Sequence, residues 1–195
     1  MRWSVAYRRA ARAKNPLWLF GLLVGLVITP VMKSAEDSAR PVAVVGHFTN
    51  MTYTEEHAYG YAVQLWRQGD ELLGLFLASE GLEGDTPAGL LEDVKFDPES
   101  GEISFRARLS IGVVYSKKHH GVPSRDLFEF AGVLAGTRLR GTVKRSDVLD
   151  PEGPPRREKV VLLRSKSIEG MEAFKSYPEW KSSADEILKA RGPKW

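Results

Sequence analysis

Apolar residues recur at every second position through most of the chain after residue 41. From Glu102 to Ile111 they alternate with serine and arginine, as expected for a strand with one buried and one solvent-exposed face. The same alternation around short turns predicts β-hairpins at residues 58–81, 90–111 and 126–147. Apolar segments at 42–48 and 159–165 bring the expected total to about eight strands.

An antiparallel sheet of this size has two unpaired edges unless it curls until its first strand meets its last. We therefore expect an all-β domain over residues 42–167 that forms an up-and-down antiparallel barrel of about eight strands, with a two-sheet β-sandwich as the alternative. Glycines inside the expected strands would permit the bends that closure needs. They are Gly60, Gly74, Gly132 and Gly141.

The first and last strands of this domain resemble those of the lipocalin-like barrels. Lipocalins open their first strand with Gly-x-Trp, and this chain has Gly46, His47 and Phe48 there. In that family an arginine late in the barrel packs over the aromatic residue, and Arg164 is the matching position here. The hairpin order and the domain length are also similar. The resemblance implies a barrel over residues 42–167 and, loosely, the binding of an apolar ligand.

The N-terminal segment lacks the alternating pattern of the later strands and consists of a basic stretch followed by an uncharged apolar run. Five cations and no acids occur up to Lys14, and residues 17–32 are uncharged with Thr29 as their one polar side chain. This run of about 16 residues falls between the ~17–25 of a membrane-spanning helix and the ~7–15 of a signal-peptide core. We expect residues 16–32 to enter a membrane.

The residues after the apolar run favour retention of this segment. Cleavage after Ala35 or Ala39 would place Lys33 or Asp37 where signal peptidase requires a small residue. Residues 1–33 are therefore expected to be an uncleaved signal anchor, followed by a linker at 34–41 and the main domain. The basic flank predicts a bacterial inner-membrane protein with that domain in the periplasm or outside the cell. Secretion after cleavage is the alternative.

The C-terminal 28 residues, 168–195, change to a helical period. Apolar residues recur at helical spacing on both sides of Pro178, and Gly192 with Pro193 ends the pattern. Two short helices are expected, which would seal one end of the barrel or lie on its outside.

Charge and cysteine content exclude several function classes. The formal net charge is +3, and because the five N-terminal cations carry +5, the remainder carries −2. Nucleic acid is therefore not expected as a partner. The absence of cysteine excludes disulfides, thiolate metal sites and cysteine nucleophiles.

Aromatic residues on the expected inward faces are candidates for lining a cavity. A barrel of eight strands is just wide enough to be filled by such side chains or to hold one small ligand, and a filled core is the favoured alternative. Glu92 shares the parity of Val94 and Phe96, so its carboxylate is expected inside the barrel, or else near the rim, where water or an arginine would satisfy it. The candidate ligand-binding residues are Tyr59, Tyr61, Glu92, Phe96, Phe105, Phe128 and Phe130.

Trp66 and Phe76 occupy even-numbered positions, whereas Leu65 and Leu75 occupy the odd-numbered positions expected to face inward. They are therefore expected to form one patch that meets the terminal helices or a partner.

No catalytic residue, metal ligand or cofactor is predicted. His119 and His120 fall in a basic loop, where neighbouring side chains are poorly placed to share an ion, and His57 beside Glu55 and Glu56 fits a polar loop better than a metal site. Gly-x-Ser-x-Gly, phosphate-binding and dinucleotide-binding motifs are absent from the sequence.

These observations favour a membrane-anchored, non-enzymatic barrel that binds a small apolar ligand or a protein partner whose identity the sequence does not indicate. Two alternatives remain. One is an enzyme acting on a lipid or isoprenoid-like substrate inside the barrel, with Glu92 and a histidine as acid and base. The other is a structural envelope protein with a solid barrel.

Overall fold

The alternating segments form long antiparallel strands in the computed structural model, which describes residues 39–82, 86–115, 119–167 and 170–193. The first strands are β1 (Ala43–Thr49), β2 (Thr52–Tyr53), β3 (His57–Gln68), β4 (Glu71–Leu82), β5 (Ala88–Leu90) and β6 (Glu92–Phe96). They are followed by β7 (Glu102–Leu109), β8 (Val113–Tyr115), β9 (His120–Pro123), β10 (Asp126–Ala135), β11 (Arg138–Asp147) and β12 (Arg156–Arg164). The expected signal anchor, residues 1–33, lies outside the described residues. Within the described ranges no helix has the length and apolar character needed to cross a membrane.

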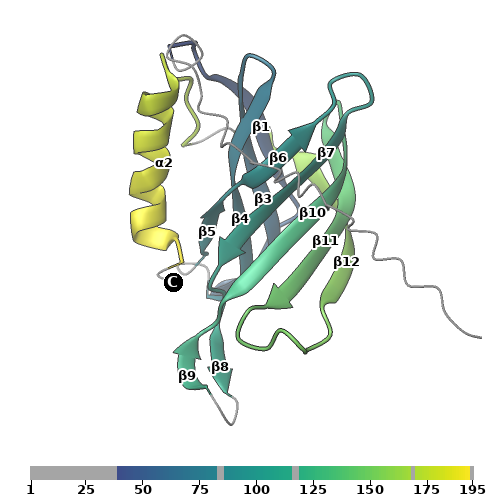
Figure 1. Cartoon of the computed structure of the whole chain (residues 1–195), viewed down its shortest axis with the longest axis vertical. Coiled ribbons are helices and arrows are strands. Elements are labelled where there is room, and N and C mark those ends of the chain that lie inside the picture. The colour runs from purple at the N-terminus through teal and green to yellow at the C-terminus, as the bar shows by residue number, and fades with distance from the viewer. Residues whose placement is uncertain (1–38, 83–85, 116–118, 168–169, 194–195) are drawn as a thin grey trace, which may run out of the picture. The chain divides into compact units, whose positions relative to one another are not determined.

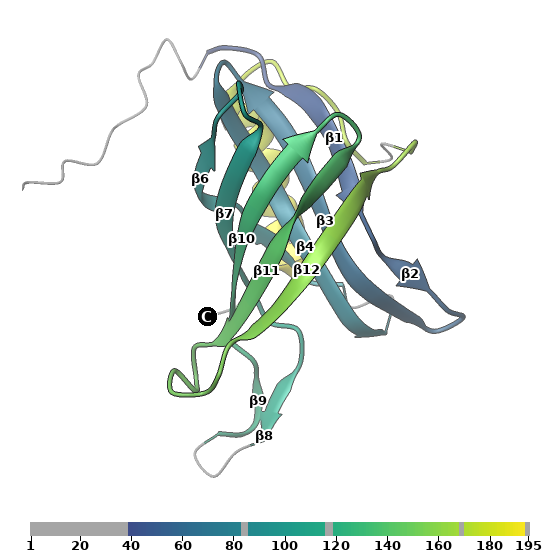
Figure 2. The ribbon, with the colours of Figure 1, turned by 90° about the vertical axis from the view of Figure 1, so that its right-hand side faces the viewer.

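The main sheet curls into a nearly closed antiparallel barrel (Figures 1 and 2). Its strand order is β5-β4-β3-β1-β12-β11-β10-β7-β6, and the short β2 pairs with β3. The two ends of this order, β5 and β6, are consecutive along the chain and are separated by Leu91, whose amide donates to the Gly74 carbonyl at 3.0 Å. One stretch of chain therefore pairs first with β4 and then with β7, which closes this side of the barrel. The sandwich alternative is not observed.

The opposite side closes less completely. Strands β1 and β12 pair at two positions, Phe48 with Arg164 and Thr49 with Leu163, and the Ser165 amide donates to the His47 carbonyl at 2.7 Å. The expected meeting of first and last strands is thus confirmed. The part of β12 before Leu163 has no backbone pairing with β1, and its side chains reach β3 instead, as Tyr61 and Glu158 show; we call this boundary between β12 and β3 the seam (Figure 2).

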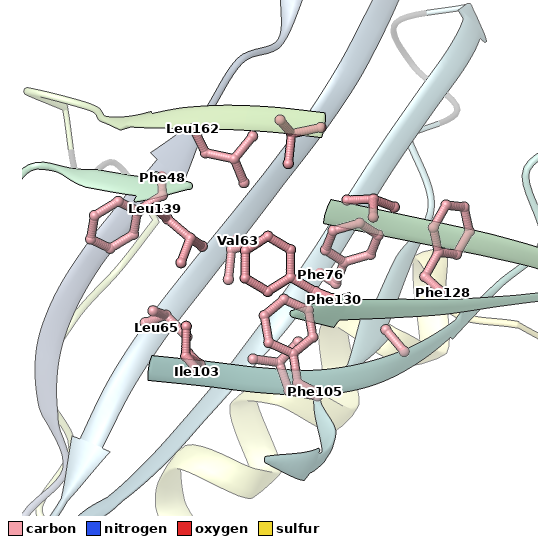
Figure 3. Packing of buried hydrophobic residues seen from close by; sticks show 14 of the residues in the cluster. Phe48, Val63, Leu65, Phe76, Ile103, Phe105, Phe128, Phe130, Leu139 and Leu162 are labelled. Atoms are coloured by element: carbon pink, nitrogen blue, oxygen red, sulfur yellow. The ribbon is translucent and has the colours of Figure 1, made fainter. Parts of the chain in front are cut away.

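A continuous hydrophobic core occupies the interior. The Phe76 ring contacts Phe128 at 5.2 Å and Phe105 at 6.0 Å between centroids, and Phe130 stacks on Phe105 at 4.9 Å. Figure 3 shows these rings, which come from β4, β7 and β10, pointing toward one another. Aliphatic residues complete the core, including Val63, Leu65, Leu109, Leu139, Val143 and Leu162, each 2% exposed or less.

Glycine allows two neighbouring strands to approach around one of these rings. Gly132 of β10 faces Gly141 of β11. A Cβ atom at Gly141 would lie 2.6 Å from the tip of the Phe130 ring and 2.3 Å from the Ala131 carbonyl oxygen. Any larger residue here would push the ring or the neighbouring strand outward, consistent with the expected role of strand glycines in barrel closure.

The helix α2 (Tyr177–Arg191) lies against the outside of the barrel (Figure 1). Its buried Trp180 and Ala184 pack with Trp66 of β3 and Leu75 of β4 in a second hydrophobic cluster. Trp66 and Trp180 make an edge-to-face contact at 6.0 Å. The helix therefore covers one outer wall of the barrel, whereas the wall formed by β10, β11 and β12 faces the viewer in Figure 2 with the helix behind it.

The expected shared patch of Trp66 and Phe76 is wrong, because the two side chains lie on opposite faces of the sheet. Trp66 pairs with Leu73 and Phe76 pairs with Val63 across the β3–β4 hairpin. Each pair joins an even to an odd position, so the inward parity changes at the turn. Trp66 consequently meets the helix as expected, whereas Phe76 is fully buried in the barrel core.

The expectation of two C-terminal helices is also wrong. The described residues before Tyr177 are not helical, and Phe174 instead forms an isolated β-bridge with Val42 through two backbone hydrogen bonds of 2.8 and 2.9 Å. The backbone groups that a helix would use are thus committed to the start of the barrel. Residues 168 and 169 lie outside the described ranges.

Candidate functional site

The structure brings five of the seven candidate residues together around the barrel core. Phe105, Phe128 and Phe130 are at most 2% exposed, and Tyr61 and Phe96 pack against the same cluster while remaining partly exposed. Because these rings contact one another, they fill the space that they were expected to line.

The other two candidates lie elsewhere. Tyr59 is 47% exposed and stacks on His57 at the start of β3. Glu92 lies on the outer face of the sheet, where its carboxylate accepts a hydrogen bond from Arg108 at 3.0 Å. The reason is a bulge at Asp93, whose φ of 51° is left-handed and shifts the register between Glu92 and Lys95. Leu91 before the bulge and Val94 after it both pack against the core, so the bulge reverses the parity used to place Glu92.

The residues that resemble the lipocalin pattern are close neighbours in the structure. Phe48 is 1% exposed and lies directly across from Arg164 on the adjoining strand. Gly46 has a φ of 154°, and a Cβ atom there would lie 2.8 Å from the Arg164 Nε and 3.4 Å from the Phe48 ring. The absence of a side chain at Gly46 therefore gives Arg164 room beside the aromatic residue.

A polar network that the sequence analysis did not select closes one end of the barrel, where β4, β7 and β11 finish and β10 and β12 begin; we call this the network end. Its centre is Asp126, which is 1% exposed. Arg145 Nε donates to Asp126 at 2.8 Å, and Arg145 Nη1 donates to Glu80 at 2.9 Å. One guanidinium thus joins the first residue of β10 to the end of β4.

Asp126 also organises the loop that follows β7. Ser124 Oγ donates to its carboxylate at 2.5 Å, and the Ile111 amide lies 3.0 Å from Ser124 Oγ and 3.3 Å from the carboxylate. The buried charge is therefore paired and hydrogen-bonded, as a charge in an apolar interior must be. The network holds in place the chain segments that lead into and out of the β8–β9 hairpin.

Arg145 also contacts an aromatic ring of the core, and its pKa and that of Tyr61 are shifted by their surroundings. The Arg145 guanidinium carbon lies 5.8 Å from the Phe128 ring centroid. Burial alone would lower the pKa of Arg145, but the hydrogen bonds and charges of Asp126 and Glu80 outweigh it and raise this pKa overall. Tyr61 donates to Glu158 at 3.0 Å across the seam, and burial together with that carboxylate raises the pKa of Tyr61.

A cavity of about 470 Å³ opens beside this network. Its lining comes from the end of β4 with Glu80, from residues 86–87, from residues 110–113 and from the C-terminal turn of α2 with Arg191. The lining combines a carboxylate and hydroxyl groups with the aliphatic side chains of Ile111 and Val113. This composition suits a small amphipathic molecule or the tip of a partner's loop.

The other described cavities lie on the outer surface of the barrel, along β6, β7, β10 and β11. Among the described residues, no three histidine or carboxylate groups gather as a metal site.

Part of the network end could have been found from the sequence. Asp126 shares the parity of Phe128 and Phe130, and Arg145 shares that of Leu139 and Val143, so both are polar residues on inward-facing positions. Glu80 could not have been assigned in this way, because the expected parity of β4 was wrong.

No family model matches the chain, and the searches of curated proteins and of solved structures find no match either.

Proposed function

We propose that the chain is a non-catalytic binding protein, tethered to a bacterial inner membrane by residues 16–32, whose barrel domain outside the cytoplasm binds its ligand at the network end. The observation that carries this proposal is the cavity beside Glu80, which contrasts with a barrel interior filled by aromatic rings. The apolar run and its basic flank support the tether.

The chemistry of the network end supports binding in preference to catalysis. Ser124 and Asp126 are hydrogen-bonded to each other and to the Ile111 amide, so they hold a loop. Glu80 has one oxygen on Arg145 and is 47% exposed, which leaves carboxylate surface free to accept a hydrogen bond from a ligand. We infer that the ligand presents a hydrogen-bond donor to Glu80 and an apolar surface to Ile111 and Val113.

The pairing of Phe48 with Arg164 beside Gly46 supports a relation to the lipocalin-like barrels. In this proposal the chain shares their up-and-down barrel and differs in placing its ligand at one end of the barrel, outside the core.

Native mass spectrometry of the full-length protein, released from lipid nanodiscs, tests the proposal. The wild-type chain should carry a bound molecule, and Ile111→Trp should lose it because the indole fills the cavity while the backbone amide bonds of Ile111 persist. Val148→Trp, at a 46% exposed position, is the matched control and should retain the molecule. An unliganded wild-type chain, or a ligand retained by Ile111→Trp, would contradict the proposed site.

A further inference from the structure

The outer face of β11 and β12 carries a set of cations that are not part of the network end. Residues of the two strands lie opposite each other in four outward-facing pairs: Arg138 with Leu163, Arg140 with Val161, Thr142 with Lys159, and Lys144 with Arg157. We call these eight residues the basic ladder. It holds five cations and no acid, whereas the chain beyond its N-terminal cations has a net charge of −2.

These cations are largely uncompensated. Lys144 contacts Glu129 of β10, but Arg138, Arg140, Arg157 and Lys159 form no ion pair with any acid among the described residues. Lys144 and Arg157 even face each other directly. Like charges at directly opposite positions destabilise a sheet, so fold stability does not account for this arrangement.

The remaining side chains of the basic ladder indicate which kind of partner it fits. Val161 and Leu163 are 48% and 53% exposed, and they stand beside Arg140 and Arg138. Cations combined with exposed aliphatic side chains suit the interface of an anionic bilayer, where headgroups neutralise the charges and the aliphatic groups enter the boundary. The ladder has no aromatic residue on which a nucleobase could stack, so a single-stranded nucleic acid is a poorer fit.

We propose that the basic ladder docks the barrel on the surface of a bilayer that contains anionic phospholipid. The inference rests on the proposed membrane tether, because the linker 34–41 spans no more than about 28 Å when fully extended and so keeps the domain near the bilayer. Docked in this way, the domain directs the wall formed by β10, β11 and β12 toward the headgroups. We call this the bare wall, because α2 covers the opposite wall and is then directed away from the bilayer.

The full chain in lipid nanodiscs provides the test, and its lack of cysteine permits labelling at single introduced positions. Thr142→Cys places a fluorophore in the basic ladder, and Ser182→Cys places it on the exposed side of α2 as the matched control. Nitroxide-headgroup lipids quench a fluorophore that approaches the bilayer. Quenching at position 142 should be at least about twofold stronger in discs with anionic lipid than in phosphatidylcholine discs, and salt at about 0.5 M should remove the difference. Position 182 should not respond.

Charge reversal assigns the effect to the ladder. Arg140→Glu combined with Lys159→Glu should abolish the additional quenching at position 142, whereas Lys175→Glu with Lys189→Glu near and on α2 should leave it unchanged. Equal quenching in neutral and anionic discs, or quenching that survives the ladder reversal, would overturn the docking proposal. So would salt-sensitive capture of polyglutamate or an oligonucleotide without any response to anionic lipid.

Failure of the tether gives a different result. A chain without a membrane anchor would elute apart from phosphatidylcholine discs in size-exclusion chromatography, before any quenching is measured. A chain that remains in the discs but shows no lipid-dependent quenching retains its tether and loses only the docking proposal.

Discussion

The two outer walls of the barrel differ in what covers them. On the wall formed by β3, β4 and β5, α2 buries Trp66, Leu75 and their neighbours in a second hydrophobic cluster. On the wall formed by β10, β11 and β12, no described helix packs over the outward side chains, and those of β11 and β12 are mostly basic. One wall therefore contributes to stability on both of its faces, and the other only on its inner face.

This difference is encoded in the strands themselves. Strand β4 carries apolar residues on both parities, since Leu72 and Phe76 face the core while Leu73 and Leu75 face the helix. Strand β11 alternates, with Leu139 and Val143 buried on one face and Arg138, Arg140, Thr142 and Lys144 on the other. A strand that is apolar on both parities requires a second covering layer, whereas strict alternation leaves one face free to interact with other molecules.

The largest expected difference between the walls is in unfolding free energy. Trp180→Ala should destabilise the protein by about 3–5 kcal/mol, because this residue is 2% exposed and packs edge-to-face on Trp66. Val161→Ala on the bare wall should change stability by no more than about 0.5 kcal/mol. Urea unfolding of the full chain, followed by far-ultraviolet circular dichroism, measures both. Equal losses in the two variants would show that the helix adds no stability to its wall.

A second contrast concerns ion pairs. Arg145→Met should cost about 3 kcal/mol, because it leaves the buried carboxylate of Asp126 without its partner. Arg106→Met removes a pair with Asp93 in which both side chains are more than half exposed, and it should cost no more than about 1 kcal/mol. The same urea unfolding experiment compares the two. If Arg145→Met were as mild as Arg106→Met, the network end would not be structurally important.

A smaller effect of opposite sign is expected within the basic ladder. Arg157→Glu replaces a repulsive pair with an attractive one opposite Lys144 and should stabilise the barrel by about 0.2–1 kcal/mol at low salt. The gain should vanish at about 1 M salt, where exposed charges are screened. Lys175→Glu, at an exposed position away from the ladder, should show no comparable gain. A loss of stability in Arg157→Glu would mean that the ladder serves the fold after all.

The alternation of apolar residues was sufficient to predict the β-rich fold and the meeting of the first and last strands. The alternation gave the wrong face of the sheet for residues that follow a turn or a bulge, where the inward-facing positions change between odd and even. The tight turn at Gly69 reversed the assignment of Phe76, and the left-handed Asp93 reversed that of Glu92. The alternation of a strand predicts which face a side chain occupies only as long as the strand is uninterrupted. It does not predict the face after a turn or a bulge.

The candidate site was less predictable than the fold. Asp126 and Arg145 stood on inward parities in the sequence, but their pairing depends on the register of β10 with β11, which sets Phe128 opposite Arg145. The cavity depends further on where α2 ends, and no local pattern specifies that contact. The aromatic candidates other than Tyr59 were placed correctly around the core, yet composition could not determine whether their rings would leave space between them.

The smallest expected effect is a pH dependence associated with His47 of β1, whose pKa burial lowers. The unfolded chain then binds a proton at this residue more readily than the folded one, so stability should decline as the pH falls through and below the ordinary histidine range near 6.5. His47→Gln should flatten this decline in urea titrations between pH 7 and 5, and His120→Gln, at an exposed position in the β8–β9 hairpin, should not. The basic ladder contains no histidine, so anionic-lipid docking should persist where barrel stability weakens. If docking and stability instead declined together, and both recovered in His47→Gln, the two walls would be coupled through β1, which pairs with β3 on one side and with β12 on the other.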